Sequence, residues 1–250
     1  MAQPRDKLAD SLAALKAIQD RGLVAIPSAE LSRTDRERLL KGGFIQPVMR
    51  GWYIPSGPNE PPRESPGWYA SFWGFCADYL NSRFGKSWCL SPEQSVHLHA
   101  GNRSVPRQLL VRSPTGGNKP ITLRHGTSLF DVRLSMPPLA DMTVKNGLQI
   151  YTLPAALIGC SPREFAAHPL DLRAALAMVT EPSGLLARLL EGGHTVVAGR
   201  LAGAFRNIGR DRIADCIIET MRTAGYATIE SDPFADRPPV ALKPGKSRPM

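Results

Sequence analysis

Cysteine is scarce in this 250-residue chain, and long apolar runs are missing from it. The four cysteines are scattered and form no Cys-x-x-Cys pair, which argues against a disulfide framework and favours a reducing compartment. No stretch approaches the roughly 20 apolar residues of a membrane-spanning helix, and acidic residues interrupt the N-terminus where a signal peptide is apolar. We therefore expect a soluble, cytoplasmic protein with no membrane partner.

Acidic residues are too few to balance the basic ones. The sequence has 31 Lys and Arg against 22 Asp and Glu, which gives a formal net charge of +9 and a pI near 9.7. Such a bias favours a polyanion such as nucleic acid, or an acidic protein partner. Ordinary solubilising charge is the alternative explanation.

The usual signatures of catalysis are missing as well. There is no Gly-x-Ser-x-Gly elbow, no Walker loop and no Gly-x-Gly-x-x-Gly before a helix. His97 and His99 form a His-x-His pair, but a capping signal at SPEQ places both on a helix, where side chains two residues apart diverge. We predict no enzymatic activity, no cofactor and no metal. A metal-dependent nuclease built on His97, His99 and Asp131 is kept as a minor alternative.

The first 57 residues have the pattern of a winged helix-turn-helix. Apolar residues recur at helical spacing over 8–18, and PSAEL predicts a brief second helix. A third helix is predicted over about 35–41, because Thr34 and Glu37 have the spacing of a capping box. Two extended segments, FIQPVM and WYIPS, then indicate a two-stranded ribbon.

This pattern gathers basic residues on two elements. Leu39 and Leu40 are expected to face the core, and Arg50-Gly51 is expected to form the ribbon turn, where glycine can take positive φ. In a winged helix the third helix enters the major groove, while the ribbon tip contacts phosphates or the minor groove. The predicted DNA-binding residues are Arg33, Arg36, Arg38, Lys41 and Arg50. Winged helices also dock on proteins, so that alternative stays open.

The rest of the chain has changes in composition that indicate its organisation. Seven aromatic residues lie in a helix predicted from Ser65 to Gly85, and we expect them to form a buried face rather than a base-stacking surface. A small sheet is predicted over roughly 105–153, and a helical array from 161 onward. We divide the chain into a winged helix-turn-helix at 1–57, a Pro-rich linker at 58–65, an α+β domain at 66–228 and a basic, Pro-rich, mobile tail at 229–250.

Three passages carry a resemblance to a known family. They are LLKGGFIQPVMRGWYIPS, SPEQSVHLHAGNRSVPRQLLVRS and GLQIYTLPAALIGC. With these passages, about three-quarters of the chain resembles the AbiEi-type antitoxins, which are transcriptional regulators of type IV toxin–antitoxin (abortive infection) systems. The segment between the first helix and Thr34 departs from the family because it is short for a full second helix.

The resemblance implies a function that the residue patterns alone do not give. It implies a winged helix that binds inverted repeats upstream of its own operon as a repressor, with Arg36, Arg38, Lys41 and Arg50 on the DNA. It also implies a C-terminal domain that counteracts a nucleotidyltransferase-like toxin without needing a stable complex. Inverted repeats are normally matched by two protein copies, so we expect a monomer or weak dimer that binds DNA cooperatively.

Two hypotheses from different classes follow. The first is a non-enzymatic, DNA-binding antitoxin. The second is a protein-binding regulatory module that controls an attached or neighbouring enzyme, such as a Fic-type adenylyltransferase, although no HPFxxGNGR-like motif occurs in these residues.

Overall fold

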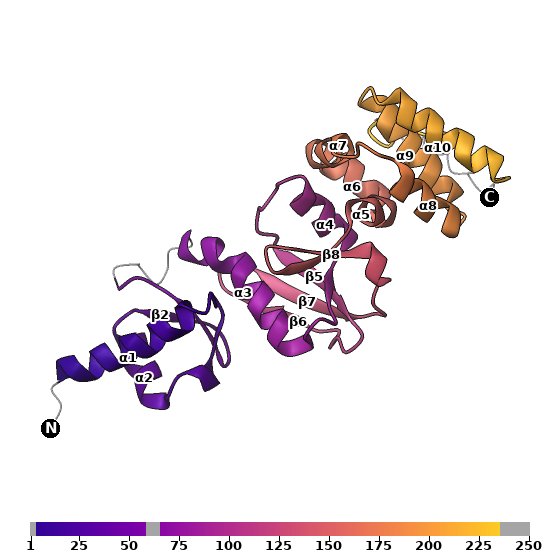
Figure 1. The fold of residues 1–250 in the computed structure, drawn as a ribbon. Coiled ribbons are helices and arrows are strands. Elements are labelled where there is room, and N and C mark those ends of the chain that lie inside the picture. Colours follow the sequence, from indigo (N-terminus) through magenta and orange to yellow (C-terminus); the bar gives the residue numbers. More distant parts are fainter. Residues whose placement is uncertain (1–3, 59–65, 236–250) are drawn as a thin grey trace, which may run out of the picture. The chain divides into compact units, whose positions relative to one another are not determined.

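The computed structural model describes residues 4–58 and 66–235, within two compact units, Met1–Ala156 (unit 1) and Leu157–Met250 (unit 2) (Figure 1). The predicted α+β class is confirmed: N-terminal helices with a small antiparallel sheet, a central mixed sheet and a C-terminal helical array. Of the predicted linker, only Pro58 is among the described residues. Residues 236–250 of the predicted tail also lie outside them.

Unit 1 begins with the element order of a winged helix-turn-helix. The elements are α1 (Pro4–Gln19), β1 (Ile26–Pro27), the 3-10 helix η1 (Ser28–Glu30), α2 (Arg33–Lys41), β2 (Ile45–Met49) and β3 (Trp52–Pro55). The strands pair antiparallel in the order β1-β3-β2, so β1 adds a third strand to the predicted ribbon. The short second helix is the single turn η1, and α2 is the third helix of the motif.

The winged helix has a small core of its own. Its buried residues are Leu15, Ile18, Ile26, Leu31, Leu39 and Ile45. The prediction for Leu39 is confirmed, but that for Leu40 was wrong, because Leu40 is 36% exposed. Consecutive helical residues point roughly 100° apart, so only one of two neighbours can face the centre of a small core.

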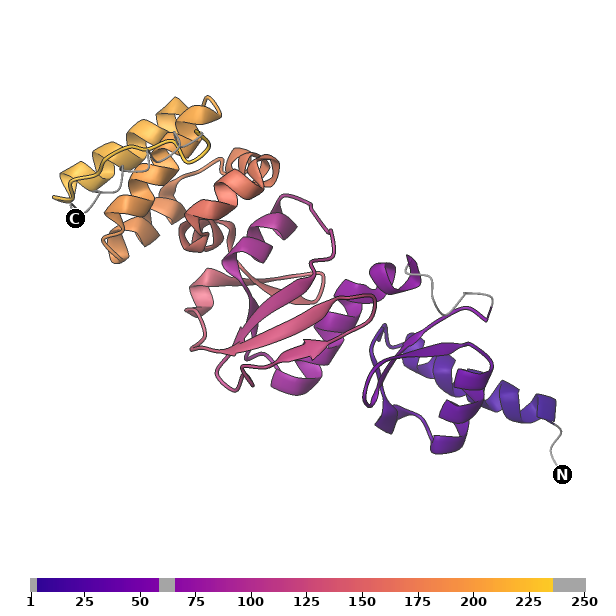
Figure 2. The same ribbon diagram turned by 180° about the vertical axis from the view of Figure 1, so that it is seen from behind.

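The remainder of unit 1 is a mixed sheet with a long helix along one face (Figure 1, Figure 2). Its elements are α3 (Pro66–Phe84), β4 (Cys89–Leu90), α4 (Pro92–His99), β5 (Gln108–Ser113), β6 (Pro120–Thr122), β7 (Ser128–Arg133), the 3-10 helix η2 (Leu139–Asp141), β8 (Met142–Lys145) and β9 (Leu148–Tyr151). The sheet order is β4-β5-β7-β6, with β5 and β7 parallel, and β8 and β9 form a separate antiparallel pair. The predicted sheet region is therefore confirmed.

The aromatic helix α3 is buried, as predicted. Most of its aromatic side chains are buried in one cluster with apolar residues of the sheet, whereas Tyr69 is 42% exposed. The same cluster includes Val48 and Ile54 of the winged helix. In addition, the Asp78 carboxylate accepts hydrogen bonds from the backbone N–H groups of Val24 and Ala25, at 2.7 and 3.0 Å. The winged helix and the central sheet thus share a core within unit 1.

Unit 2 is the predicted helical array. Its helices are α5 (Leu153–Gly159, which begins in unit 1), α6 (Pro162–Ala167), α7 (Pro169–Ala177), α8 (Ser183–Glu191), α9 (Thr195–Asn207) and α10 (Asp211–Thr223). The helix α9 packs against α7, α8 and α10 and is buried along most of its length. Two of its glycines, Gly199 and Gly203, lie under the backbone of residues 229–232. The first residues of the predicted tail are therefore packed on α9.

No helix in the described part of the chain is both long and apolar enough to span a bilayer.

Candidate nucleic-acid interface

The helix α2 begins at Arg33, two residues before the predicted start at about residue 35. Ser32 is the N-cap, and its hydroxyl oxygen accepts the backbone N–H of Asp35 at 3.1 Å. The Asp35 carboxylate in turn accepts the hydroxyls of Ser32 and Ser11, and these bonds lower the pKa of Asp35. Thr34 was predicted as the cap but lies inside the first turn. The cap fastens α2 to α1 because Ser11 belongs to α1.

The outward face of α2 follows helical spacing. Its exposed residues from the cap onward are Ser32, Arg33, Thr34, Glu37, Leu40 and Lys41. Positions 33, 37, 40 and 41 fall on one side of the helix, opposite the buried Leu39. In a helix that enters a groove, side chains on this side would meet base edges or phosphates. Of these exposed residues, the predicted set includes Arg33 and Lys41 and does not include Thr34 or Glu37.

Two predicted DNA contacts hold the winged helix together instead of pointing away from it. The Arg36 guanidinium donates to the carbonyl of Ser28, with an Nη1–O distance of 3.1 Å, and so joins α2 to η1. The Arg38 guanidinium donates to the carbonyl of Lys7 at 3.4 Å and forms an ion pair with Asp35 at 3.7 Å. The expectation that both side chains are free was wrong, because backbone carbonyls of neighbouring elements lie within their reach.

The other three predicted residues remain exposed. Arg33 is 85% exposed and pairs with Glu37 one turn later at 2.9 Å; the hydrogen bond to Glu37 raises the pKa of Arg33. Exposed pairs of this kind contribute little to stability because water screens both charges, so a phosphate can replace Glu37 at little cost. Lys41 and Arg50 are exposed, and neither forms a side-chain hydrogen bond or ion pair with residues 4–58 or 66–235.

The ribbon is held in place on one side. Gly51 takes φ +81° in its turn, as predicted, and its carbonyl accepts the N–H of Ser28 at 2.8 Å. The Trp52 ring makes edge-to-face contacts with Phe75 and Tyr79 of α3, with centroids 6.3 and 5.1 Å away. One side of the ribbon is therefore packed on α3, and the tip with Arg50 is the part that remains exposed.

His99 and Asp131 have structural partners in unit 1. The His99 ring lies 2.8 Å from the carbonyl of Tyr151 through Nε2, and burial lowers the pKa of His99. Asp131, 1% exposed, pairs with Arg83 at 2.7 Å and accepts the N–H of Gly117. Taken by themselves, the described residues of unit 1 bring no three His, Cys, Asp or Glu ligand atoms within 4.8 Å of one another. The trio His97, His99 and Asp131 is therefore not a metal site.

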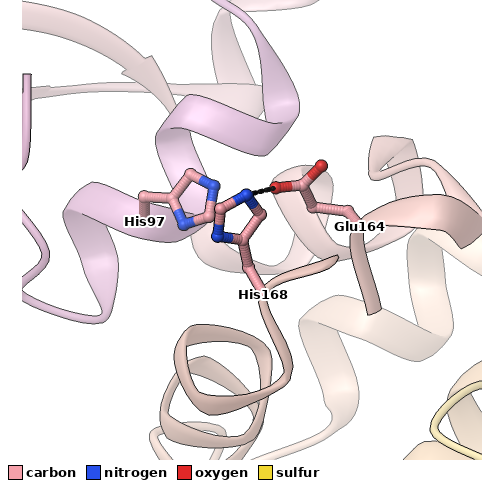
Figure 3. Close-up of side chains that lie close together, drawn as sticks. All are labelled: His97, Glu164 and His168. Atoms are coloured by element: carbon pink, nitrogen blue, oxygen red, sulfur yellow. Dashed lines mark ion pairs between the residues drawn. The ribbon is translucent and has the colours of Figure 1, made fainter. Parts of the chain in front are cut away.

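One further histidine is paired in unit 2. The His168 Nε2 lies 3.5 Å from the Glu164 carboxylate, one turn earlier in the chain (Figure 3). His97, also labelled in Figure 3, is carried by α4 of unit 1.

The fold and the exposed cations define a winged-helix α+β protein with a basic third helix and a basic ribbon tip. No protein-family model matches the chain, and no curated protein matches it either. Its fold is similar to that of the Rv2827c protein from Mycobacterium tuberculosis, a crystal structure, with a TM-score of 0.52. The match covers 85% of this chain and 81% of that chain at 16% sequence identity, so the likeness is one of fold.

Proposed function

We propose that this protein is a non-enzymatic, DNA-binding transcriptional regulator that uses α2 and the ribbon tip. The observation that carries the proposal is the placement of Arg33, Lys41 and Arg50, which are exposed on the third helix and the turn of a winged-helix frame. Each phosphate that such a cation neutralises releases condensed counterions. Binding therefore depends on salt, with a slope that reports the number of contacts.

Within this proposal the residues have different roles. Arg33, Thr34, Glu37 and Lys41 belong to the helix face that enters the major groove, where side chains of these types can hydrogen-bond to base edges. Arg50 contacts a phosphate and contributes affinity without sequence preference. Arg36 and Arg38 position α2 through their carbonyl contacts.

The test is fluorescence anisotropy of the full chain with its own upstream DNA and a shuffled duplex, each at two salt concentrations. We expect a preference for the upstream DNA that survives the higher salt. The double variant Arg33→Gln/Lys41→Gln should lose that preference and lower the salt slope by roughly 2. A matched control, Lys16→Gln/Arg212→Gln, removes two exposed charges from α1 and α10 and should change neither.

Two outcomes separate this proposal from its alternative. If Arg33→Gln/Lys41→Gln keeps the preference for the upstream DNA, α2 is excluded as the element that recognises the DNA sequence. Equal binding of both duplexes that disappears at high salt would instead favour the protein-docking alternative, with the net charge of +9 acting on an acidic partner. The pair Arg36→Ala and Arg38→Ala is a poorer test, because it also removes contacts within the fold.

We further propose that the regulator is the antitoxin of a type IV toxin–antitoxin system. The support is the resemblance of its sequence passages to AbiEi-type antitoxins. It would bind operator inverted repeats and counteract a nucleotidyltransferase-like toxin in the cytoplasm. Co-expression with the reading frame immediately downstream tests this: rescue of growth by the full chain is expected. No toxicity, or no rescue, would contradict the antitoxin role while leaving DNA binding open.

A further inference from the structure

Unit 2 contains a basic pocket that the DNA-binding proposal does not use. It has a volume of about 620 Å³ and lies among α6, α7, α9 and residues 231–235. Its charged lining residues are Arg163, Arg173, Arg200 and Asp232. Pockets of about 300–1,000 Å³ hold small-molecule ligands in proteins, so the size fits a small organic molecule.

Arg200 is the most unusual residue of this lining. It is only 8% exposed, and its guanidinium donates to the carbonyl of Cys160 at 3.1 Å and lies 5.5 Å from the Phe165 ring centroid. Its Nε is buried without a hydrogen-bond acceptor, and Arg200 forms no ion pair with any residue that the structure describes. Burial lowers the pKa of Arg200, but a guanidinium stays protonated at neutral pH.

A buried charge without a counter-charge is costly. Removing a guanidinium from water is strongly unfavourable unless an anion and further hydrogen bonds offset the lost hydration. A neutral carbonyl and a ring face offset part of it, and one donor still lacks an acceptor. An anion in the pocket would supply both the charge and the acceptor.

The neighbouring arginines define the charge of that anion. Arg163 is exposed and has no side-chain partner among the described residues, while Arg173 donates to the Asn207 amide oxygen at 3.3 Å and stacks on Phe234 at 4.4 Å. The one acidic residue of the lining, Asp232, accepts from Asn207 and from the Phe234 backbone. Three arginines against one aspartate leave a surplus of two positive charges, which matches a phosphate monoester at about −2.

The apolar part of the lining suits a ligand with a body as well as a charge. Phe165 and Phe234 meet edge to face with centroids 5.5 Å apart, and Pro162, Pro169 and Ala166 complete the wall. Guanidinium forks recognise phosphate oxygens in pairs. We propose that this pocket binds the phosphate group of a small phosphorylated molecule, with Arg200 and Arg163 as the ligands of the phosphate.

Isothermal titration calorimetry of the full chain tests this with three probes: AMP, inorganic phosphate and adenosine. We expect saturable binding of AMP and none of adenosine. If inorganic phosphate binds as tightly as AMP, free phosphate is the ligand. If inorganic phosphate binds more weakly than AMP, the ligand is a phosphate ester. The variant Arg163→Gln should weaken AMP binding roughly tenfold, because a charged hydrogen bond is lost.

The controls make the result independent of folding and of DNA binding. Arg163 is exposed, so we expect Arg163→Gln to keep the fold; the buried Arg200 is left unchanged because its substitution would also alter stability. Arg212→Gln removes an exposed arginine of α10 outside the pocket and should leave AMP affinity unchanged. The absence of saturable binding by AMP and phosphate would overturn the proposal, as would full affinity in Arg163→Gln. Neither result bears on DNA binding by α2.

Discussion

Basic residues occupy opposite environments in the two units. Arg33 on α2 is 85% exposed and has an acidic neighbour, Glu37, whereas Arg200 on α9 is 8% exposed and forms no ion pair within the described residues. A charge in water is inexpensive to keep and acts through salt-sensitive attraction. A buried charge is expensive, so its presence indicates a specific counter-charge. The comparison shows that the location of each arginine, more than the net charge of +9, indicates what it binds.

The largest effect is expected from a substitution in the core beneath α2. Leu39 is fully buried, so Leu39→Ala should destabilise the winged helix by about 2–5 kcal/mol and abolish DNA binding. Its neighbour provides the control: Leu40 is 36% exposed, and Leu40→Ala should cost about 1 kcal/mol or less. Urea unfolding followed by tryptophan fluorescence measures both, because all four tryptophans lie in unit 1.

The same two variants test whether the units work separately. AMP binding by unit 2 should persist in Leu39→Ala under conditions where DNA binding is lost. If Leu40→Ala were as destabilising as Leu39→Ala, the assignment of the inner and outer faces of α2 would be incorrect.

Much of the fold was predictable because its signals are local. Caps, helical spacing and glycine stops gave α1, α3 and α4, and alternation gave the sheet region. The shared core was not predictable, because Asp78 meets Val24 across 54 positions of sequence and neither residue carries a pattern that pairs it with the other. The pocket of unit 2 was missed for the same reason: Arg163 and Phe234 meet only after α6 to α10 have packed.

The candidate DNA interface was predictable in composition and only partly in orientation. Thr34 has a glutamate three positions later, as a capping box requires, whereas the observed cap Ser32 has an aspartate there, so the rule selected Thr34. Arg36 belongs to the correct helix, but its acceptor is the backbone carbonyl of Ser28, and every residue has such a carbonyl. Sequence patterns thus located the basic helix more reliably than the direction of each side chain.

In unit 2 a glycine substitution next to the pocket should have the next largest effect. A Cβ on Gly203 would lie 2.2 Å from the carbonyl oxygen of Ser231, so Gly203→Ala must displace the backbone of residues 231–232. We expect a cost of about 1–3 kcal/mol and weaker AMP binding, because Phe234 is part of the pocket wall. Differential scanning calorimetry and titration measure the two effects. Gly57→Ala meets no atom within 4 Å and should change neither.

A smaller effect distinguishes the two possible caps of α2. Ser32→Ala removes the hydroxyl that accepts the Asp35 N–H and should cost about 1 kcal/mol of stability in unit 1. Thr34→Ala changes an exposed residue inside the first turn and should stay within about 0.5 kcal/mol. Tryptophan fluorescence in urea measures both variants. A larger loss of stability in Thr34→Ala than in Ser32→Ala would show that Thr34 is the cap, as the sequence predicted.

The smallest expected effect is a dependence on acid. The hydroxyls of Ser32 and Ser11 lower the pKa of Asp35 in the folded chain below its ordinary value of 3.8. Since the folded pKa is the lower one, the stabilisation is present above about pH 4 and is lost as the pH falls through the folded pKa. Asp35→Asn should therefore be less stable at pH 7 but lose less stability between pH 5 and pH 3 than the wild-type chain. In the two proposals DNA binding requires an ordered α2 and AMP binding does not, so the same acidic range should weaken DNA binding more in the wild type than in Asp35→Asn. Parallel stability curves for the two proteins would show that Asp35 does not link α2 to α1 through its charge.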